Sequence, residues 1–187
     1  MELSRRQFLV GVGGAMAAAA SPQLASASIN ATTRNSGLIA AKTLSFASTH
    51  TGEKGTFTFM EHGKYVGEEI ARMNQLMRDH RTGDVEQMDV NLFELLANLL
   101  DKVDASDKEI QIISAYRSPK TNAKLAANSN GVAKKSYHMR GMAMDIRVPG
   151  VDLGHLHKAA LDLKAGGVGK YASSNFIHVD TGRVRFW

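Results

Sequence analysis

The sequence has 187 residues, of which 43% are hydrophobic and 22% charged, and it contains three prolines. These values are typical of one folded domain that can bury a core, and they exclude a disordered or fibrous chain. The chain has no cysteine, which excludes disulfides, thiolate zinc sites and a cysteine nucleophile, so any metal must be held by histidine and carboxylate side chains.

The chain is basic, with a formal net charge of +5 and an isoelectric point near 9.5. Such a charge favours anionic surroundings, such as nucleic acid, lipid head groups or cell-wall polymers. Lysine and arginine are scattered, however, and aromatic residues make up only 6% of the chain. A nucleic-acid groove combines basic stripes with stacking rings, so we expect no nucleic-acid partner.

Residues 1–27 have the pattern of an export signal. Arg5 and Arg6 precede an apolar run rich in glycine and alanine from Phe8 to Ala20, and "ASA" ends the segment. The pattern resembles a twin-arginine signal and predicts cleavage after residue 27 and export to the periplasm. Because the apolar run is shorter than the ~20 residues of a spanning helix, we expect no membrane insertion once the signal is removed.

Periodicity predicts the elements of the first half of the chain. Residues 28–42 are polar and unpatterned, and we expect them to form a flexible leading segment. Residues 43–66 alternate apolar and polar side chains around "TGEKG", which is typical of a β-hairpin. Apolar residues then recur at helical spacing from Val66 to about His80 and from Val90 to Val103. Both helices are expected to contribute to the core.

The second half mixes apolar strands with short helices. Residues 109–118 ("EIQIISAYRS") read as a buried strand that ends in a turn, followed by a helix over 121–128. Alternation predicts strands over 141–148 and 175–180, and a helix is expected from about Leu153 to Lys164, before the glycine-rich "AGGVG". We therefore predict an α+β domain with a small antiparallel sheet flanked by helices.

Three polar residues near these strands suggest a metal site. If the strands around Asp145 and His178 pair as antiparallel neighbours, both side chains project from one face with Cβ atoms ~5 Å apart. His138 lies in the loop just before the first of these strands. Two imidazoles and one carboxylate, with a fourth position left for water, form the ligand set of a catalytic zinc site. The same residues could also be separate polar groups with their own hydrogen bonds, and spacing alone leaves both interpretations open.

Zinc at such a site would allow an amide bond to be hydrolysed without a protein nucleophile. It would lower the pKa of its water to roughly 7 and polarise a carbonyl group. It would also explain why the aspartate stands in an apolar run, because burying Asp145 unpaired would cost several kcal/mol.

The motifs around these residues resemble the M15 metallopeptidases, the D-alanyl-D-alanine carboxypeptidase and dipeptidase group. "SYHMRGMAMD" matches their S-x-H-x-x-G-x-A-x-D signature, and "FIHVD" is similar to their second histidine segment. The likeness is greatest to an exported branch with twin-arginine signals, and it covers residues 43–187. The resemblance implies one zinc ion held by His138, Asp145 and His178, in a fold shared with the hedgehog signalling domain.

The resemblance also implies roles for two further residues. Arg117 of "YRS" matches an arginine that stabilises negative charge on the reacting carbonyl oxygen, which lowers the barrier to hydrolysis. Its alternative role is an ion pair at the end of a strand. Ser136 matches a serine that contacts substrate, and its alternative role is to shape the loop. Gly141 is expected to let the backbone turn between the ligands.

The general base has no obvious candidate. Many M15 enzymes carry an acidic residue three positions before the second histidine, where this chain has Asn175, and an amide cannot accept the proton. Asp180 lies on the predicted face of His178 and is a candidate base, although it could instead orient that ligand. His155 and His157 are further candidates, but their helix favours a solvent-facing or structural role.

These observations predict an exported zinc peptidase that hydrolyses peptidoglycan stem peptides or crosslinks as a murein endopeptidase. We expect it to act as a monomer with peptidoglycan as its partner, and whether it cuts D,D or L,D bonds stays open. Two alternatives remain. One is a non-catalytic wall-binding module that zinc only stabilises, and the other is a D,D-dipeptidase or carboxypeptidase.

Overall fold

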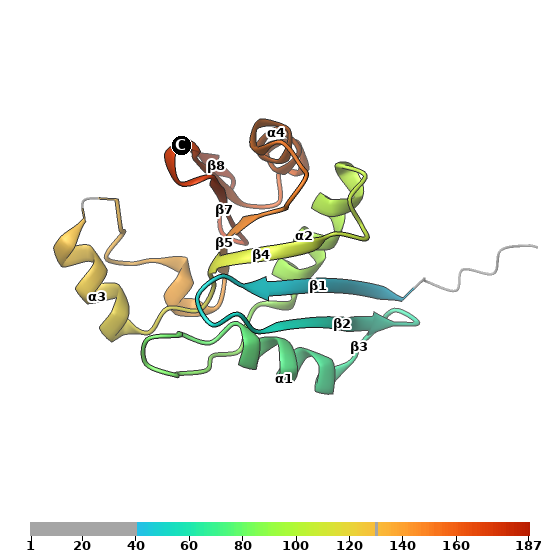
Figure 1. The fold of residues 1–187 in the computed structure, drawn as a ribbon, viewed down its shortest axis with the longest axis horizontal. Coiled ribbons are helices and arrows are strands. Elements are labelled where there is room, and N and C mark those ends of the chain that lie inside the picture. Colours follow the sequence, from blue (N-terminus) through green and yellow to red (C-terminus); the bar gives the residue numbers. More distant parts are fainter. Residues whose placement is uncertain (1–40, 130) are drawn as a thin grey trace, which may run out of the picture. The chain divides into compact units, whose positions relative to one another are not determined.

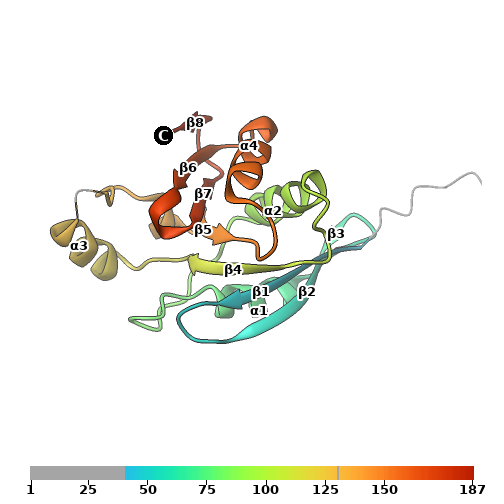
Figure 2. The same ribbon diagram turned by 45° about the horizontal axis from the view of Figure 1, so that its top comes forward.

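The structure is a computed structural model that describes residues 41–129 and 131–187. One mixed sheet runs through this part of the chain. Within it, eight strands follow the order β3-β2-β1-β4-β5-β7-β6-β8 (Figures 1 and 2). The strands are β1 Lys42–Ser48, β2 Lys54–Glu61, β3 Lys64–Tyr65, β4 Glu109–Ser114, β5 Ala143–Arg147, β6 Gly167–Tyr171, β7 Phe176–Asp180 and β8 Arg185–Phe186. The helices are α1 Gly67–Leu76, α2 Val90–Lys102, α3 Pro119–Asn128 and α4 Leu153–Leu163, with short 3₁₀ helices η1 Tyr137–Arg140 and η2 Ala172–Ser174.

The predicted hairpin is confirmed as the antiparallel pair β1 and β2, which β3 extends. Its alternation separates two faces, as the period of a strand requires. Phe46 and Phe59 are fully buried. On the opposite face, the hydroxyl groups of Thr43 and Thr58 form a cross-strand hydrogen bond of 3.0 Å.

The helices confirm the α+β class and most of the predicted helical ranges. Helix α2 begins at its cap Asp89, whose side chain accepts a hydrogen bond from the Asn91 amide, and its leucine stripe is buried. Helix α1 ends at Leu76, before the predicted end near His80, because Asp79 forms a turn by accepting from the Arg81 amide. In Figures 1 and 2, α1 lies along the β1–β2 hairpin, and α2 and α4 pack against each other.

The prediction of a small antiparallel sheet is wrong, because the sheet is larger and mixed. Strand β4 lies parallel to β1, with Ser45 opposite Glu109. A strand that returns after a helical crossover, here α1 and α2, can lie parallel to its neighbour, whereas a tight hairpin cannot produce that direction. Strand β8 also pairs in parallel, with β6.

Strand β6, which alternation did not reveal, includes two glycines of the "AGGVG" segment. A Cβ atom on Gly167 would lie 2.5 Å from Asp180 Oδ2, and one on Gly169 would lie 2.5 Å from the Trp187 ring. Glycine therefore lets a carboxylate and an indole approach the strand closely. These two side chains recur in the site described below.

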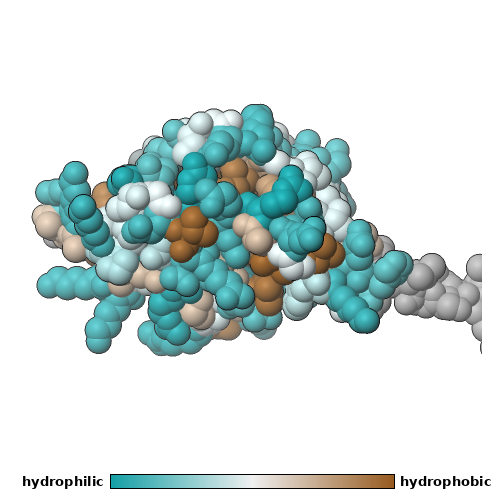
Figure 3. Space-filling view, turned by 90° about the horizontal axis from the view of Figure 1, so that it is seen from below, coloured by the Kyte–Doolittle hydropathy of each residue, from teal (hydrophilic) through white to brown (hydrophobic). Residues whose placement is uncertain are grey.

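The face of the molecule seen in Figure 3 is mainly hydrophilic, with scattered hydrophobic side chains. Within the described residues, no helix combines the length and apolar character needed to cross a bilayer. The expected signal over residues 1–27 and residues 28–40 of the expected leading segment lie outside the described residues. The end of that segment differs from the expectation, because Lys42 already belongs to β1.

Gly141 is the turn between η1 and β5, and its substitution should be costly. Its φ is 64°, and an added Cβ would lie 2.4 Å from the Gln87 carbonyl oxygen. Gly141→Ala should therefore lower the free energy of unfolding by about 3 kcal/mol, part from the left-handed backbone and part from the clash. Urea denaturation monitored by circular dichroism would measure this loss.

The matched control is Gly83→Ala, because Gly83 has a φ of 78° and nothing within 4 Å of the added atom. This control should lose only about 1 kcal/mol, the cost of the backbone conformation alone. Equal losses in the two variants would contradict the steric role given to the turn at Gly141.

Candidate metal centre

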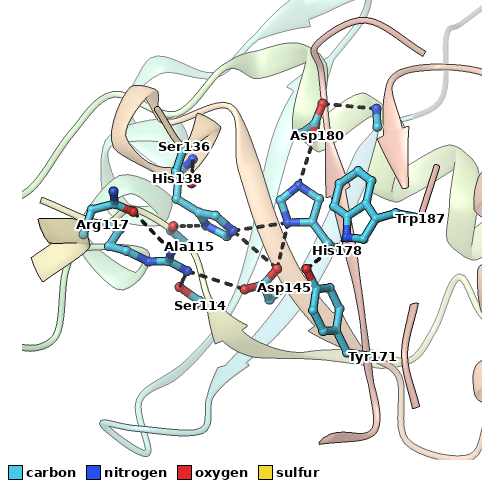
Figure 4. Close-up of polar contacts among 12 residues, drawn as sticks. Ser114, Ala115, Arg117, Ser136, His138, Asp145, Tyr171, His178, Asp180 and Trp187 are labelled. Atoms are coloured by element: carbon cyan, nitrogen blue, oxygen red, sulfur yellow. Dashed lines mark hydrogen bonds and ion pairs between the residues drawn. The ribbon is translucent and has the colours of Figure 1, made fainter. Parts of the chain in front are cut away.

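Three buried side chains from separate elements converge beside the centre of the sheet (Figure 4). His138 comes from η1, Asp145 from β5 and His178 from β7. His138 Nε2 lies 3.3 Å from His178 Nδ1 and 3.3 Å from Asp145 Oδ1. His178 Nδ1 lies 2.9 Å from the same Asp145 oxygen.

The sheet register accounts for two of these positions. Strands β5 and β7 are antiparallel neighbours, with Asp145 directly opposite His178, so the condition under which both side chains share one face is met. The loop prediction for His138 needs a small correction, because the residue lies in the short helix η1. Ser136 begins that helix by accepting a hydrogen bond of 3.3 Å from the His138 amide, so it shapes the segment that carries this histidine.

Hydrogen bonds behind the cluster fix both imidazoles. His138 Nδ1–H donates to the Ala115 carbonyl oxygen over 2.7 Å, and His178 Nε2–H donates to Asp180 Oδ2 over 2.9 Å. Both acceptors can only accept, so in a neutral ring the other nitrogen carries a lone pair that points into the cluster. Two lone pairs and a carboxylate oxygen facing one another repel unless a proton or a metal ion lies between them, so the group could hold a metal ion.

The donor set fits zinc in both type and spacing. Zinc binds imidazole nitrogen and carboxylate oxygen at roughly 2.0–2.2 Å, so tetrahedral geometry puts ligand atoms about 3.3 Å apart. Two of the separations between the three donor atoms are 3.3 Å, and the third is shorter, at 2.9 Å. His138 Nε2, Asp145 Oδ1 and His178 Nδ1 could therefore hold one ion and leave its remaining side to the adjoining cleft.

The close packing of the three side chains shifts the pKa values of Asp145 and His178. Burial raises the pKa of the Asp145 carboxyl, but the neighbouring imidazoles, above all His138, outweigh it and hold that pKa well below its usual range. Burial lowers the pKa of His178, but hydrogen bonds to Asp145 and Asp180 raise it overall. The pocket thus favours an ionised carboxylate with positive charge beside it.

Arg117 lies next to the cluster, as the resemblance implied. Its Nη2 is 3.7 Å from Asp145 Oδ2 and donates to Ser114 Oγ over 3.3 Å, and its Nη1 donates to Asn122 Oδ1 over 3.4 Å. Its backbone amide donates to the His138 carbonyl, which ties the two segments together. The side chain is buried, and its Nε has no hydrogen-bond partner among the described residues. Contacts through both Nη atoms therefore hold the guanidinium beside Asp145.

Asp180 lies behind His178 rather than in the cleft. It is fully buried, and its two oxygens accept from His178, from the Arg185 guanidinium and from the amides of Gly167 and Gly182. Burial raises its pKa, but these donors outweigh burial and hold the pKa below its usual range. Of the two roles left open by the sequence, this position favours orientation of the ligand over proton transfer to a substrate.

The position where many M15 enzymes carry the base, and the two remaining candidates for it, also lie away from this cleft. Asn175 is an exposed turn residue with a left-handed backbone, at a φ of 53°, and it lines a separate hollow of about 260 Å³. Asparagine tolerates that conformation better than most residues. His155 and His157 lie on α4 and do not line the cleft beside the cluster.

The cluster opens into a cleft of about 770 Å³. Its lining includes four cationic residues but one carboxylate among the residues described, Asp145. Sequence reasoning missed several of the lining side chains, because they come from unrelated elements that no spacing pattern connects. These are Lys135, Tyr137, Tyr171, Phe176, Arg183, Arg185 and Trp187.

Comparisons with known proteins point in one direction. A family model described as Peptidase_M15_2, "Peptidoglycan L,D-endopeptidase MepK", matches residues 38–187. Over 186 residues the chain is 41% identical to "Peptidoglycan L,D-endopeptidase MepK" of Escherichia coli K12, a match that covers 100% of the chain and 98% of that relative. It is also 43% identical over 144 residues to "Probable peptidoglycan L,D-endopeptidase MepK" of Haemophilus influenzae, covering 77% of each protein.

Asp180→Asn should weaken metal binding, because an amide orients the His178 imidazole less firmly and adds no negative charge behind it. We expect zinc affinity to fall about 10- to 100-fold, measured by competition with a chromogenic chelator. Asp79→Asn is the matched control, since Asp79 is a buried carboxylate that binds Ser118 instead of a metal ligand. A similar loss of zinc affinity in both variants would contradict the orienting role of Asp180.

Proposed function

The chain belongs to the M15 peptidases, in the family described as peptidoglycan L,D-endopeptidase, and from this membership we propose that it is a zinc-dependent endopeptidase that cleaves L,D bonds in peptidoglycan. The observation that carries the proposal is the cluster of His138, Asp145 and His178, whose free donor atoms face one another at the floor of a cleft. The names of the relatives favour the L,D bond over the D,D bond.

In this proposal the cluster holds the zinc ion, and the groups behind it orient the two histidines. A bound zinc ion would supply Lewis acidity, which activates water and a peptide carbonyl for hydrolysis near neutral pH. The Ala115 carbonyl and Asp180 hold the two histidine rings in the tautomers that such an ion needs. Because these orienting groups are already in place, little reorganisation precedes the reaction.

Arg117 is the candidate for stabilising the developing negative charge. Its guanidinium is held by Ser114, Asn122 and Asp145 at the wall of the cleft. A donor fixed in advance near the reacting carbonyl is worth more than a mobile one, because it needs no reorientation as charge develops. Ser136 also lines the cleft and can donate its hydroxyl hydrogen to a substrate, since its oxygen already accepts from the His138 amide.

The charge of the cleft suits an acidic peptide. Arg185 is engaged by Asp180, but Lys135 and Arg183 are exposed where they line the cleft. Peptidoglycan stem peptides carry free carboxylates, which cations at the entrance would attract and orient. We therefore assign these two residues to substrate capture rather than to the chemical step.

The N-terminal pattern favours an activity outside the inner membrane. We propose that residues 1–27 are a twin-arginine signal, that the segment after it leads into the domain at Lys42, and that the domain forms a periplasmic peptidase that acts as a monomer. The paired arginines support the export route. The names of the relatives support a compartment where peptidoglycan is accessible.

The direct test is hydrolysis of purified crosslinked muropeptides. The zinc-loaded protein should split L,D-crosslinked dimers into monomers and leave D,D-crosslinked dimers intact, as resolved by reversed-phase chromatography. His138→Ala should lower this rate about a thousandfold, because the metal contributes several kcal/mol to the barrier. His155→Ala, at an exposed histidine on α4, should leave the rate unchanged.

Other results would point to the alternatives. Tight zinc binding without cleavage of either dimer would indicate a wall-binding module. Hydrolysis of free D-alanyl-D-alanine with intact dimers would indicate a dipeptidase.

The capture role of the exposed cations predicts a change in KM. The double variant Lys135→Ala/Arg183→Ala should raise KM for muropeptides about five- to tenfold with kcat within twofold, and the difference should shrink in 0.5 M salt, through screening. Lys158→Ala, an exposed cation on α4 that does not line the cleft, serves as the control. An unchanged KM in the double variant would refute the assignment.

A further inference from the structure

We propose that Trp187 is a substrate-contacting wall of the cleft that positions the peptide beside the metal centre. This inference rests on the proposed function and adds a specificity residue to it. The indole lies next to a cluster ligand, with its ring centroid 5.2 Å from that of His178, and it lines the same cleft (Figure 4). The sequence holds one tryptophan, and this is its position.

The indole is held firmly despite its exposure. The Trp187 side chain donates its Nε1–H to Tyr171 Oη over 3.0 Å. Its amide donates to the Val168 carbonyl, and its carbonyl accepts from the Lys170 amide, both over 3.2 Å. The residue is therefore attached to β6 through both its backbone and its ring.

Two neighbours complete the support. The Arg185 guanidinium lies 5.1 Å from the centre of the Trp187 ring, and it is itself held by Asp180. Gly169 leaves the space under the ring, since a Cβ there would lie 2.5 Å from the indole. The same hydrogen-bonded set therefore supports the indole and the His178 ligand.

A fixed aromatic ring that stays half exposed is suited to a binding surface. Trp187 is 51% exposed, although burying a tryptophan is strongly favourable. A rigid ring offers contact area without an entropic cost on binding, which is why such side chains dominate recognition sites.

The chemistry of the wall indicates which part of the substrate it takes. The cations Lys135 and Arg183 suit carboxylates, whereas the indole offers apolar area beside the reacting centre. We assign to Trp187 the aliphatic side-chain carbons of the stem-peptide residue next to the cleaved bond. Its contact would fix that residue while Arg117 and the cluster act on the carbonyl group.

Kinetics with the zinc-loaded protein and L,D-crosslinked dimers test the assignment. Trp187→Ala should raise KM about tenfold with kcat within threefold, and Trp187→Phe should restore most of the affinity because it keeps an aromatic surface. Phe186→Ala is the matched control, since Phe186 is 77% exposed and does not line the cleft. It should leave KM unchanged.

A structural role would give a different result. If the indole only supported His178, Trp187→Ala would lower zinc affinity or kcat while KM stayed the same. That outcome, or an equal effect of Phe186→Ala, overturns the proposal. Zinc content and thermal unfolding, measured on each variant, would reveal such a structural role.

Fluorescence separates this inference from the proposed activity. The emission of the single tryptophan should change and saturate as L,D-crosslinked dimers are added to the His138→Ala variant, or to the chelated wild-type protein if that variant does not fold. The midpoint should move when Lys135 and Arg183 are replaced. Saturable change without hydrolysis by the zinc-loaded protein would refute the activity and keep the contact, whereas unchanged emission would refute the contact.

Discussion

The antiparallel pairing of β5 with β7 is the constraint on which the site depends. It sets Asp145 opposite His178, so a carboxylate and an imidazole share one face of a buried sheet. A one-residue slip of either strand would turn its side chain to the other face and separate the pair. The short helix η1 brings His138 to the same point. The hydrogen bond from the Arg117 amide to the His138 carbonyl oxygen holds Arg117 beside the cluster.

Hydrogen bonds from the two histidines to groups behind them determine which imidazole nitrogens carry the protons. A buried carboxylate and two imidazoles could neutralise one another by proton exchange, but the Ala115 carbonyl and Asp180 hold the protons on the outward nitrogens. Asp180 in turn binds Arg185, which lies over the Trp187 ring. The metal ligands and the proposed substrate wall therefore share one set of supporting contacts.

Local pattern predicted much of this arrangement. Alternation in "GMAMDIRV" and "NFIHVD" identified the two strands and the shared face of Asp145 and His178, and the helical stripe gave α2 nearly to its ends. The M15 resemblance is confirmed by the family match. The roles assigned to individual site residues, and zinc itself, remain predictions.

Other features of the fold and the site depend on contacts between distant segments, which a local sequence pattern does not reveal. The parallel pairing of β4 with β1 follows from how α1 and α2 pack, and β6 was hidden because glycines have weak strand propensity. Position alone suggested Asn175 as the place of the missing base, but its left-handed turn puts it on a separate hollow. Trp187 reaches the cleft through hydrogen bonds to β6, which the sequence pattern did not reveal.

Zinc-edge X-ray absorption on the zinc-loaded protein tests the central claim most directly, with His138→Ala as the reference. We expect one zinc ion per chain with two imidazole nitrogens and carboxylate oxygen at roughly 2.0–2.2 Å, and the loss of one imidazole in the variant. A spectrum with no imidazole, or one that His138→Ala leaves unchanged, would contradict it.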